Sequence, residues 1–419
     1  MPFRPLIAAG ILGLLVVARP AVAAAADGIA VQSLAAPSEP SPEATDFRLG
    51  GDGRQTRFVM DLSQKVDVAA FTLADPYRVV VDLPQVVFKL PAHAGEQGRG
   101  LIKAFRYGLI MQGGSRIVFD TNGPVRVDKA FTLAAVDGQP ARLVIDLVKT
   151  DRQSFLHDME VAAVALPHHH SRQNIATQPD GDSRPLVVID PGHGGIDSGT
   201  KGLDGQDEKD IVLAFGLKLR AALEKTGKYR VAMTRSDDTF IPLTERVRIA
   251  RQLKAALFIS VHADSVPRSE GQAEGASVYT LSEHASDAEA ARLAETENKS
   301  DIIAGVDLTA EPDDVANILI DLAQRETKTF SVQFARTVAG DIKTVAPLHA
   351  HPVKSAGFIV LKAPDVPSVL VELGYMSTRR DLKNLTSPDW QERTAKAMAQ
   401  AVDDFFVRRF VGTASVGAR

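Results

Sequence analysis

Three short apolar runs of the sequence each lead into a side chain that can bind a metal ion or move a proton. The runs span 187–189, 256–261 and 368–371, and the side chains that follow them are His193, His262 and Glu372. Apolar, β-branched runs of this length are typical of buried strands, and the Pro-Gly pair before His193 ends the first. Open α/β sheets place their sites at the carboxyl ends of strands, so we expect these side chains to meet in one site.

Two imidazoles and a carboxylate are the ligand types that a catalytic zinc ion takes, with a fourth position left for water. His193 and His262 supply the imidazoles. Glu208 is the best-placed carboxylate, because a glycine-rich loop joins it to His193 and lets the chain fold back. Asp207 and Asp210 lie at the same turn and remain alternatives. We therefore expect one Zn²⁺ per chain.

A hydrolytic zinc site also needs a group that takes the proton of water. Glu372 arrives from a separate strand and need not bind the metal, so we assign it as the general base. Asp190 and Asp264 stand beside the two histidine segments, and we expect them to orient the imidazoles. Each residue alone has an ordinary explanation, as a loop histidine or a helix-end carboxylate. Their joint placement at strand ends favours a site.

The segment 185–410 alternates between strand and helix patterns, which predicts a three-layer α/β domain with a sheet flanked by helices. We expect helices at 209–226, 243–253 and 388–410, and further strands at 229–234, 276–281 and 358–361.

A small all-β domain precedes it, at 47–150, where short β-type runs are separated by turn residues. We expect a two-sheet sandwich. The runs span 57–62, 66–73, 78–83, 101–107, 116–120 and 142–147. Several of them begin with Arg and end with Asp, which indicates either an internal repeat or strands that end in an acidic turn. Catalytic residue types do not cluster here, so binding is the expected role.

The N-terminal residues 1–26 have the pattern of a secretory signal peptide: a short basic start, an apolar stretch and a small-residue cleavage site at 21–23. The alternative is an uncleaved anchor, but the apolar stretch is shorter than a membrane span needs. A flexible spacer is expected at 27–46. The chain has no cysteine, so no disulfide stabilises it, and its net charge of −4 argues against nucleic acid as a partner.

Two further stretches lack regular patterning. The segment 151–184 is expected to be an exposed linker, and 411–419 a tail. The linker carries His168, His169 and His170. A mobile linker gives three imidazoles no fixed geometry, so we do not assign them as a metal site.

A long connection of about 282–340 separates two expected strands and carries helical patterns at 285–298 and 313–338. Connections of this length in a compact domain are functional or disordered, and the helix propensity favours function. The alternative is a solvated helical excursion.

Four segments resemble the zinc-dependent N-acetylmuramoyl-L-alanine amidases of the type-3 family: 188–195, 208–210, 260–264 and 371–375. The resemblance covers about 185–410. It implies that His193, Glu208 and His262 bind zinc and that Glu372 is the catalytic glutamate. It also implies cleavage of the amide between N-acetylmuramic acid and L-alanine in peptidoglycan, used in cell separation.

The β domain resembles the AMIN domain at 57–62 and 76–84, which implies a periplasmic protein that attaches to peptidoglycan and is recruited to the division septum. The long connection resembles that of regulated amidases, in which a helix covers the zinc until a LytM-type activator displaces it. The resemblance thus implies that 285–338 is autoinhibitory, with Glu297 preferred over Glu295 at the open position of the zinc. The segment 351–357 departs from the Asn-Pro-His-Arg pattern of close relatives, which leaves His351 without a role.

The sequence leaves two other functions open. One is a non-catalytic wall-binding scaffold of the division machinery, and the other is a zinc peptidase acting on stem peptides. We expect a monomer that has no transmembrane anchor once the signal peptide is removed.

Overall fold

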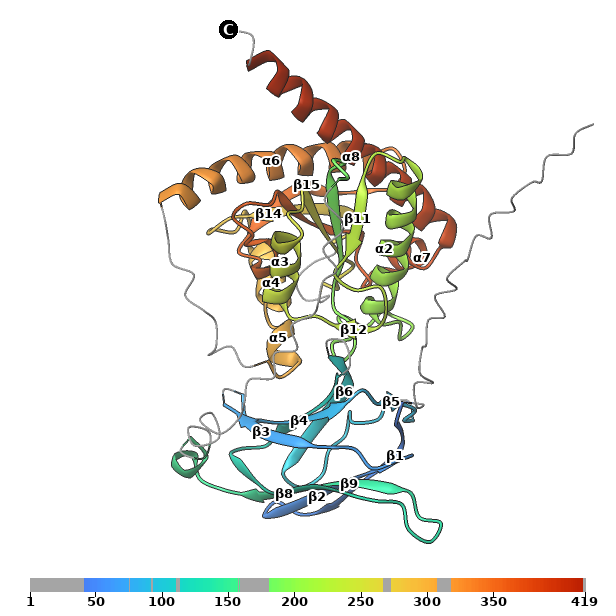
Figure 1. Ribbon diagram of the computed structural model, residues 1–419, viewed down its shortest axis with the longest axis vertical. Coiled ribbons are helices and arrows are strands. Elements are labelled where there is room, and N and C mark those ends of the chain that lie inside the picture. The colour runs from blue at the N-terminus through green and yellow to red at the C-terminus, as the bar shows by residue number, and fades with distance from the viewer. Residues whose placement is uncertain are drawn as a thin grey trace, which may run out of the picture. The chain divides into compact units, whose positions relative to one another are not determined.

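The computed structural model describes residues 41–74, 76–91, 93–110, 114–156, 158, 181–266, 273–306 and 318–416 (Figure 1). For 318–326 and 409–416 only the backbone is described. The expected signal peptide, most of the expected spacer, and His168, His169 and His170 lie outside the described residues.

The N-terminal part is a sandwich of two sheets. One has the strand order β5-β1-β2-β9-β8 and the other β12-β6-β7-β4-β3. The strands are β1 (Glu43–Gly51), β2 (Gln55–Leu62), β3 (Ala69–Leu73), β4 (Arg78–Pro84), β5 (Val87–Phe88), β6 (Ile102–Ile110), β7 (Gly114–Thr121), β8 (Val125–Leu133) and β9 (Ala141–Lys149). The two-residue β12 (Thr239–Phe240), which pairs with β6, comes from the second part of the chain. Aromatic side chains fill the space between the sheets, with the rings of Phe58 and Phe119 4.8 Å apart.

Sequence patterning missed four of these strands: the two-residue β5 and β12, and the longer β1 and β8. β1 begins at Glu43, inside the segment 27–46 expected to be a spacer, and β8 lies in a stretch without an apolar run. Each of β1 and β8 has only one fully buried residue, so neither needs a continuous apolar run.

The recurring Arg-to-Asp form of the strands follows from antiparallel pairing. An Arg at the start of one strand lies opposite an Asp at the end of its neighbour. The pairs are Arg57–Asp146, Asp61–Arg142, Arg78–Asp120 and Asp82–Arg116. Two of them are ion pairs in the structure, with Nε to Oδ1 distances of 2.6 Å for Arg57–Asp146 and 2.5 Å for Arg116–Asp82. Opposite charges across a strand pair stabilise the register.

The second part contains a six-stranded mixed sheet in the order β11-β10-β13-β16-β14-β15. Its strands are β10 (Leu186–Pro191), β11 (Arg230–Met233), β13 (Leu257–His262), β14 (Ala276–Leu281), β15 (Leu348–Ala356) and β16 (Ser368–Glu372). β10, β13 and β16 are parallel neighbours, and β14 runs antiparallel to β16. Parallel neighbours end at one edge of the sheet, and this edge carries the site.

Helices cover both faces of this sheet and make three layers (Figure 1). One face packs on α2 (Glu208–Lys225), α6 (Ile318–Ile342) and α8 (Pro388–Val416). The other packs on α3 (Leu243–Gln252) and α4 (Ala288–Glu297). The remaining helices are α5 (Ser300–Ile303), α7 (Arg379–Leu385) and the 3-10 helix η3 (Ile359–Leu361). None of the described helices combines the length and apolarity that crossing a membrane requires.

Three expectations for this domain are wrong. The helix α8 continues to Val416, into the segment 411–419 that was expected to be a tail. The run 358–361 forms η3 and not a strand, and the edge strand β15 precedes it. In addition, the expected excursion does not extend to 340, because Phe334, Val338 and Ile342 of α6 are fully buried in the core. A helical pattern does not distinguish a core helix from an inserted one. Of the connection expected at 282–340, the helices that do not belong to the same core as α6 are α4 and α5.

Candidate active site

Three side chains with metal-binding groups converge at the edge where β10, β13 and β16 end. One ligand atom from each of His193, Glu208 and His262 lies within 4.8 Å of the others, and all three residues are buried. His262 is the last residue of β13 and pairs with Glu372, the last residue of β16. The fold thus brings together residues that lie far apart in the sequence.

The spacing of these atoms fits a tetrahedral metal ion. His193 Nε2 lies 3.2 Å from Glu208 Oε2, and His262 Nδ1 lies 3.3 Å from Glu208 Oε1. Ligands held at about 2.0–2.1 Å from a tetrahedral zinc ion are about 3.3 Å apart. Among the described residues, neither imidazole nitrogen has a hydrogen-bond partner, although both are buried. Buried polar atoms left in this way indicate a missing ligand, and a borderline-soft divalent cation suits two nitrogens and a carboxylate.

Backbone groups fix the carboxylate of Glu208. The N–H of Ala263 donates to Oε1 at 2.8 Å, and the N–H of Thr200 donates to Oε2 at 3.0 Å. A Cβ at Gly199 would lie 2.7 Å from Glu208 Oε2 and from the ring of His193, and a Cβ at Gly192 would lie 2.3 Å from the ring of His262. Only glycine leaves room for the ligands at these two positions.

Asp197 orients the ring of His193 and was not singled out in the sequence. Its Oδ2 lies 2.9 Å from His193 Nδ1. If Nδ1 carries the proton, Nε2 keeps its lone pair for a metal. Burial alone would raise the pKa of Asp197, but the imidazole of His193 lowers it to about 2. The position four residues after a candidate ligand, in the same glycine-rich loop, was the available sequence signal.

Asp190 and Asp264 do not contact an imidazole, in contrast to the role expected for them. Asp190 accepts from Arg246, Thr234 and Ser260, which fixes the loop rather than the ring. Burial opposes its ionisation, but Arg246 lowers the pKa of Asp190.

Asp264 instead connects two parts of the site. Its carboxylate accepts from the hydroxyl of Thr200, and its N–H donates to Glu372 Oε2 at 3.0 Å. The alternative ligands lie elsewhere: Asp207 pairs with Lys201 at 2.7 Å, and Asp210 is not in the ligand group.

Glu372 is fully buried beside this group. Its Oε2 is held by the N–H of Asp264, whereas Oε1 has no hydrogen-bond partner among the described residues. Burial, together with the negative charges of Glu208, Asp264 and Glu297, raises the pKa of the Glu372 carboxyl well above its ordinary value. The side chain thus has one fixed oxygen and one oxygen free to exchange a proton.

Glu297, the last residue of α4, places a fourth metal-binding group beside His193, Glu208 and His262. Glu297 Oε2 lies 3.1 Å from His262 Nδ1 and 3.5 Å from His193 Nε2. Glu295, the other carboxylate considered, is exposed and pairs with Lys299 at 2.7 Å. The buried stripe of α4 consists of Ala290, Leu293, Ala294 and Glu297. A glutamate in an otherwise apolar helical stripe was the sequence signal for this contact.

Polar contacts anchor α4 and α5 at several points. Asn298 bonds with the carbonyl of Gly357 and the N–H of Ile359. Ser300 donates to the Asp197 carboxylate that orients His193, and Asp301 accepts from the N–H of Leu243 at 2.8 Å.

Three arginines of the β domain donate to the carbonyls at and after the end of α5. Arg78 reaches Ile302, Arg106 reaches Ile303 at 2.7 Å, and Arg116 reaches Gly305 at 2.8 Å. Cations stabilise the free carbonyls of a helix C-terminus. The β domain therefore contributes to holding α5.

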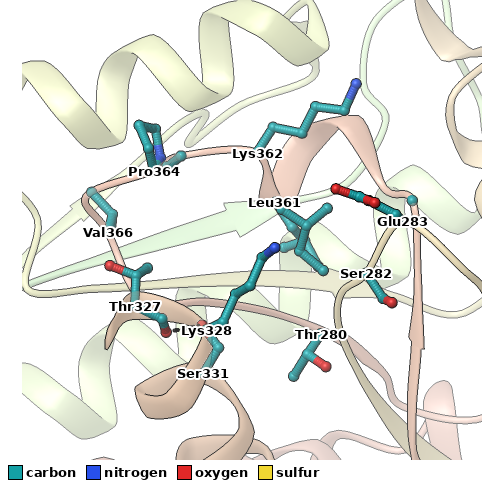
Figure 2. Close-up of a pocket in the computed structure, with 13 residues that line it drawn as sticks. Thr280, Ser282, Glu283, Thr327, Lys328, Ser331, Leu361, Lys362, Pro364 and Val366 are labelled. Atoms are coloured by element: carbon teal, nitrogen blue, oxygen red, sulfur yellow. Dashed lines mark hydrogen bonds between the residues drawn. The ribbon is translucent and has the colours of Figure 1, made fainter. Parts of the chain in front are cut away.

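A separate cavity of about 480 Å³ is lined by α6, the end of β14 and the segment around η3 (Figure 2). Figure 2 shows Lys328 of α6 extending toward Leu361. Because β14 runs antiparallel to β16, the residues after Leu281 lie at the opposite edge of the sheet from Glu372. None of the predicted site residues lines this cavity.

Comparison with known proteins assigns both parts of the chain. The family described as N-acetylmuramoyl-L-alanine amidase matches residues 187–404, and the AMIN domain matches 44–147. These matches confirm the resemblances expected for the two parts.

Several amidases are similar over most of the chain or of its catalytic part. N-acetylmuramoyl-L-alanine amidase AmiC of Escherichia coli O6:H1 is 34% identical over 84% of this chain and 86% of its own. AmiC of Neisseria meningitidis serogroup B is 31% identical over 90% of this chain and 92% of its own. Among solved structures, amidase AmiC2 of Nostoc punctiforme is 29% identical over 54% of this chain and 99% of its own, with a TM-score of 0.40. The chain belongs to the N-acetylmuramoyl-L-alanine amidase family and carries an AMIN domain before its catalytic domain.

Proposed function

We propose that this peptidoglycan amidase uses one zinc ion, bound by His193, Glu208 and His262, with Glu372 as the general base. The convergence of these three ligands, with two buried imidazole nitrogens lacking hydrogen bonds, carries the proposal. When bound, zinc supplies a Lewis acid that polarises the amide carbonyl. The bond that breaks joins the lactyl carbonyl carbon of N-acetylmuramic acid to the nitrogen of L-alanine.

Glu372 has the properties that the proton transfers need. Oε1 takes a proton from water as the water oxygen bonds to the carbonyl carbon, and the same carboxyl then delivers that proton to the departing alanine nitrogen. Burial and the negative surroundings raise the pKa of Glu372, which makes its carboxylate a stronger base for the first transfer. The N–H of Asp264 keeps the carboxyl in one orientation during both transfers.

We propose further that α4 and α5 keep the enzyme inactive until they are displaced. Glu297 lies against both imidazole nitrogens, where the water and the substrate carbonyl would have to enter. The apolar contact of α4 is small, consisting of two alanines and Leu293, so polar contacts provide much of its docking. An element held in this way suits release by a partner. The alternative, a solvated excursion, does not account for the burial of Glu297.

The proposed cellular setting follows from the other segments. The signal peptide expected at 1–26 directs the chain to the periplasm, the AMIN domain brings it to peptidoglycan at the division septum, and a LytM-type activator displaces α4 and α5. The enzyme then splits the septal wall as a monomer. A scaffold role without catalysis is less well supported, because a complete ligand set and a general base would serve no purpose in it.

Product analysis separates this proposal from the peptidase alternative. Purified sacculi are digested with the full chain and with Glu297→Ala, each with and without zinc, and the products are identified by mass spectrometry. Amidase action releases complete stem peptides that begin with a free L-alanine amine and leaves glycan strands with free lactyl groups. Shortened peptides, or release that does not depend on zinc, would overturn the proposal.

A further inference from the structure

A second carboxylate of α4 is held by groups of the catalytic core, at a distance from the metal ligands. Glu289, in the first turn of the helix, accepts from the hydroxyl of Tyr375 at 3.1 Å. Its other oxygen lies 2.9 Å from Lys354 Nζ and 3.5 Å from His349 Nε2. Three donors thus surround one carboxylate. A favourable position at a helix N-terminus explains a glutamate there, but it does not explain three converging donors.

The three donors belong to the core and not to the segment that they hold. Lys354 and His349 lie on β15, and Tyr375 follows β16. The side chain of Lys354 is 2% exposed and that of His349 11%. The carboxylates that face Lys354 are Glu289 and, at 3.5 Å, Asp287, the N-cap of α4. A buried ammonium is stable only with a partner, so displacement of α4 leaves Lys354 without its carboxylates.

The position of this group relative to the catalytic residues follows from the strand register. Ser277 of β14 lies opposite Glu372, and Tyr279 lies opposite Lys354. The hydroxyl of Tyr375 is 3.2 Å from Ser277 Oγ and 3.3 Å from the hydroxyl of Tyr279. Residues two apart on a strand share a face, so the donors and Glu372 lie on the same side of the sheet.

The two glutamates of α4 give a length scale. Glu289 and Glu297 are the second and the last residues of α4, which corresponds to about 12 Å along an α-helix. An extended peptide covers about 3.3–3.6 Å per residue, so the same span corresponds to three or four residues of a peptide chain. Glu297 occupies the end at which the scissile amide would lie. The lactyl carboxyl of the sugar is itself part of that amide, so a carboxylate such as that of Glu289 corresponds to a group on the peptide side of the substrate.

We propose that Lys354, His349 and Tyr375 form a subsite for a free carboxylate of the stem peptide, three or four residues beyond the scissile amide. In the closed state Glu289 fills this subsite while Glu297 covers the metal ligands, so α4 imitates the substrate at both ends. This inference rests on the proposed function, because it names the part of the substrate that the core recognises.

The test uses the full chain carrying Glu297→Ala, which the proposed autoinhibition makes active without an activator. Two substrates are compared: an N-acetylmuramoyl tetrapeptide with free carboxylates on its third and fourth residues, and the same compound with these carboxylates amidated. Amidation is expected to raise KM about tenfold or more and to change kcat less than about twofold. Equal KM values for the two substrates would overturn the proposal, whatever the behaviour of any variant.

Variants in the same background assign the effect to Lys354. Lys354→Met should raise KM for the free-carboxylate substrate to the value of the amidated one, and Lys354→Arg should keep most of the difference. Lys362→Met changes an exposed lysine elsewhere on the domain and should keep all of it. A rise in KM by the same factor for both substrates in Lys354→Met would indicate a structural role and contradict the subsite.

Binding of the sugar-free tetrapeptide to the zinc-free chain carrying Glu297→Ala separates this inference from the proposed function. By calorimetry, the free-carboxylate peptide should bind about tenfold or more tightly than its amidated form, and Lys354→Met should remove the preference. Absence of hydrolysis with this preference intact would contradict the proposed function and support the subsite. Absence of the preference would contradict the subsite.

Discussion

The carboxylate of Glu297 lies 3.1 Å from His262 Nδ1, although 35 positions separate the two residues in the sequence. The same oxygen is 3.5 Å from His193 Nε2. The helix that carries Glu297 therefore blocks the face on which the imidazoles are free of hydrogen bonds. Removal of this side chain tests whether the contact keeps the enzyme inactive.

Glu297→Ala should raise the basal rate of peptide release from sacculi about 10- to 100-fold. A contact to a charged group contributes about 1.5–3 kcal/mol, and its loss shifts the equilibrium between the closed and the open state by about this factor. Dye release from labelled sacculi measures the rate. Glu295→Ala is the matched control, since it removes an exposed carboxylate of the same helix. An unchanged rate in Glu297→Ala, or an equal rise in both variants, would argue against a specific block.

Glu372→Gln should separate metal binding from proton transfer. The variant should keep one zinc per chain and lose about 10²- to 10⁴-fold in rate, because Glu372 exchanges protons and need not hold the metal. His262→Ala should lose both zinc and activity. Metal analysis by mass spectrometry, alongside the rate, checks the two variants. Loss of zinc from Glu372→Gln would show that the glutamate is a ligand.

Asp197→Asn should weaken zinc binding about 10- to 100-fold, because the carboxylate fixes the ring and proton position of His193. A competition titration with a chromogenic chelator measures the affinity. Asp207→Asn lies in the same loop, pairs with Lys201 away from the ligands, and should leave the affinity unchanged. Equal affinities for Asp197→Asn and the unaltered chain would remove Asp197 from the site.

Arg78→Met should raise the basal rate a few-fold, and less than Glu297→Ala does. Arg78 donates to the carbonyl of Ile302 at the end of α5, so its loss loosens the segment without opening the metal ligands directly. Arg126→Met, on β8, is the control. The effect should disappear in a chain that already carries Glu297→Ala. An additive increase in the double variant would mean that Arg78 acts elsewhere.

Arg246→Met should destabilise the catalytic domain by about 3–5 kcal/mol, since it leaves Asp190 charged and buried. Arg246 is 1% exposed, and Nη1 lies 2.8 Å from Asp190 Oδ1. It also donates to the carbonyl of His193 at 2.7 Å. Chemical denaturation measures the change, with the partly exposed Arg248→Met as the control expected to remain within about 1 kcal/mol. A small effect would mean that water or another side chain replaces the guanidinium.

The sequence predicted the fold class and the catalytic edge because both depend on short-range patterns. Apolar runs that end at His193, His262 and Glu372 specify buried parallel strands, and parallel strands end at one edge. The two-sheet sandwich followed in the same way from alternating runs. The match to the amidase family confirms the activity that the family resemblance of these segments implied.

Features that depend on tertiary packing were not predictable in this way. β1 and β8 each have only one fully buried residue and lack a continuous apolar run, and α6 has the same helical pattern whether it is inserted or part of the core. Asp190 was expected beside an imidazole, but its partner Arg246 comes from a helix 56 positions later. The role of Glu289 depends on side chains from two distant elements, which no local pattern indicates.

Anomalous diffraction at the zinc edge, on crystals of the zinc-loaded full chain, shows whether these residues bind zinc in the closed state. We expect one peak, about 2.0–2.2 Å from His193 Nε2, His262 Nδ1 and the carboxylate of Glu208, with Glu297 as the fourth ligand. A zinc ion bound elsewhere would rule out this ligand set, and one at this position with Glu297 turned away from it would rule out the block by α4.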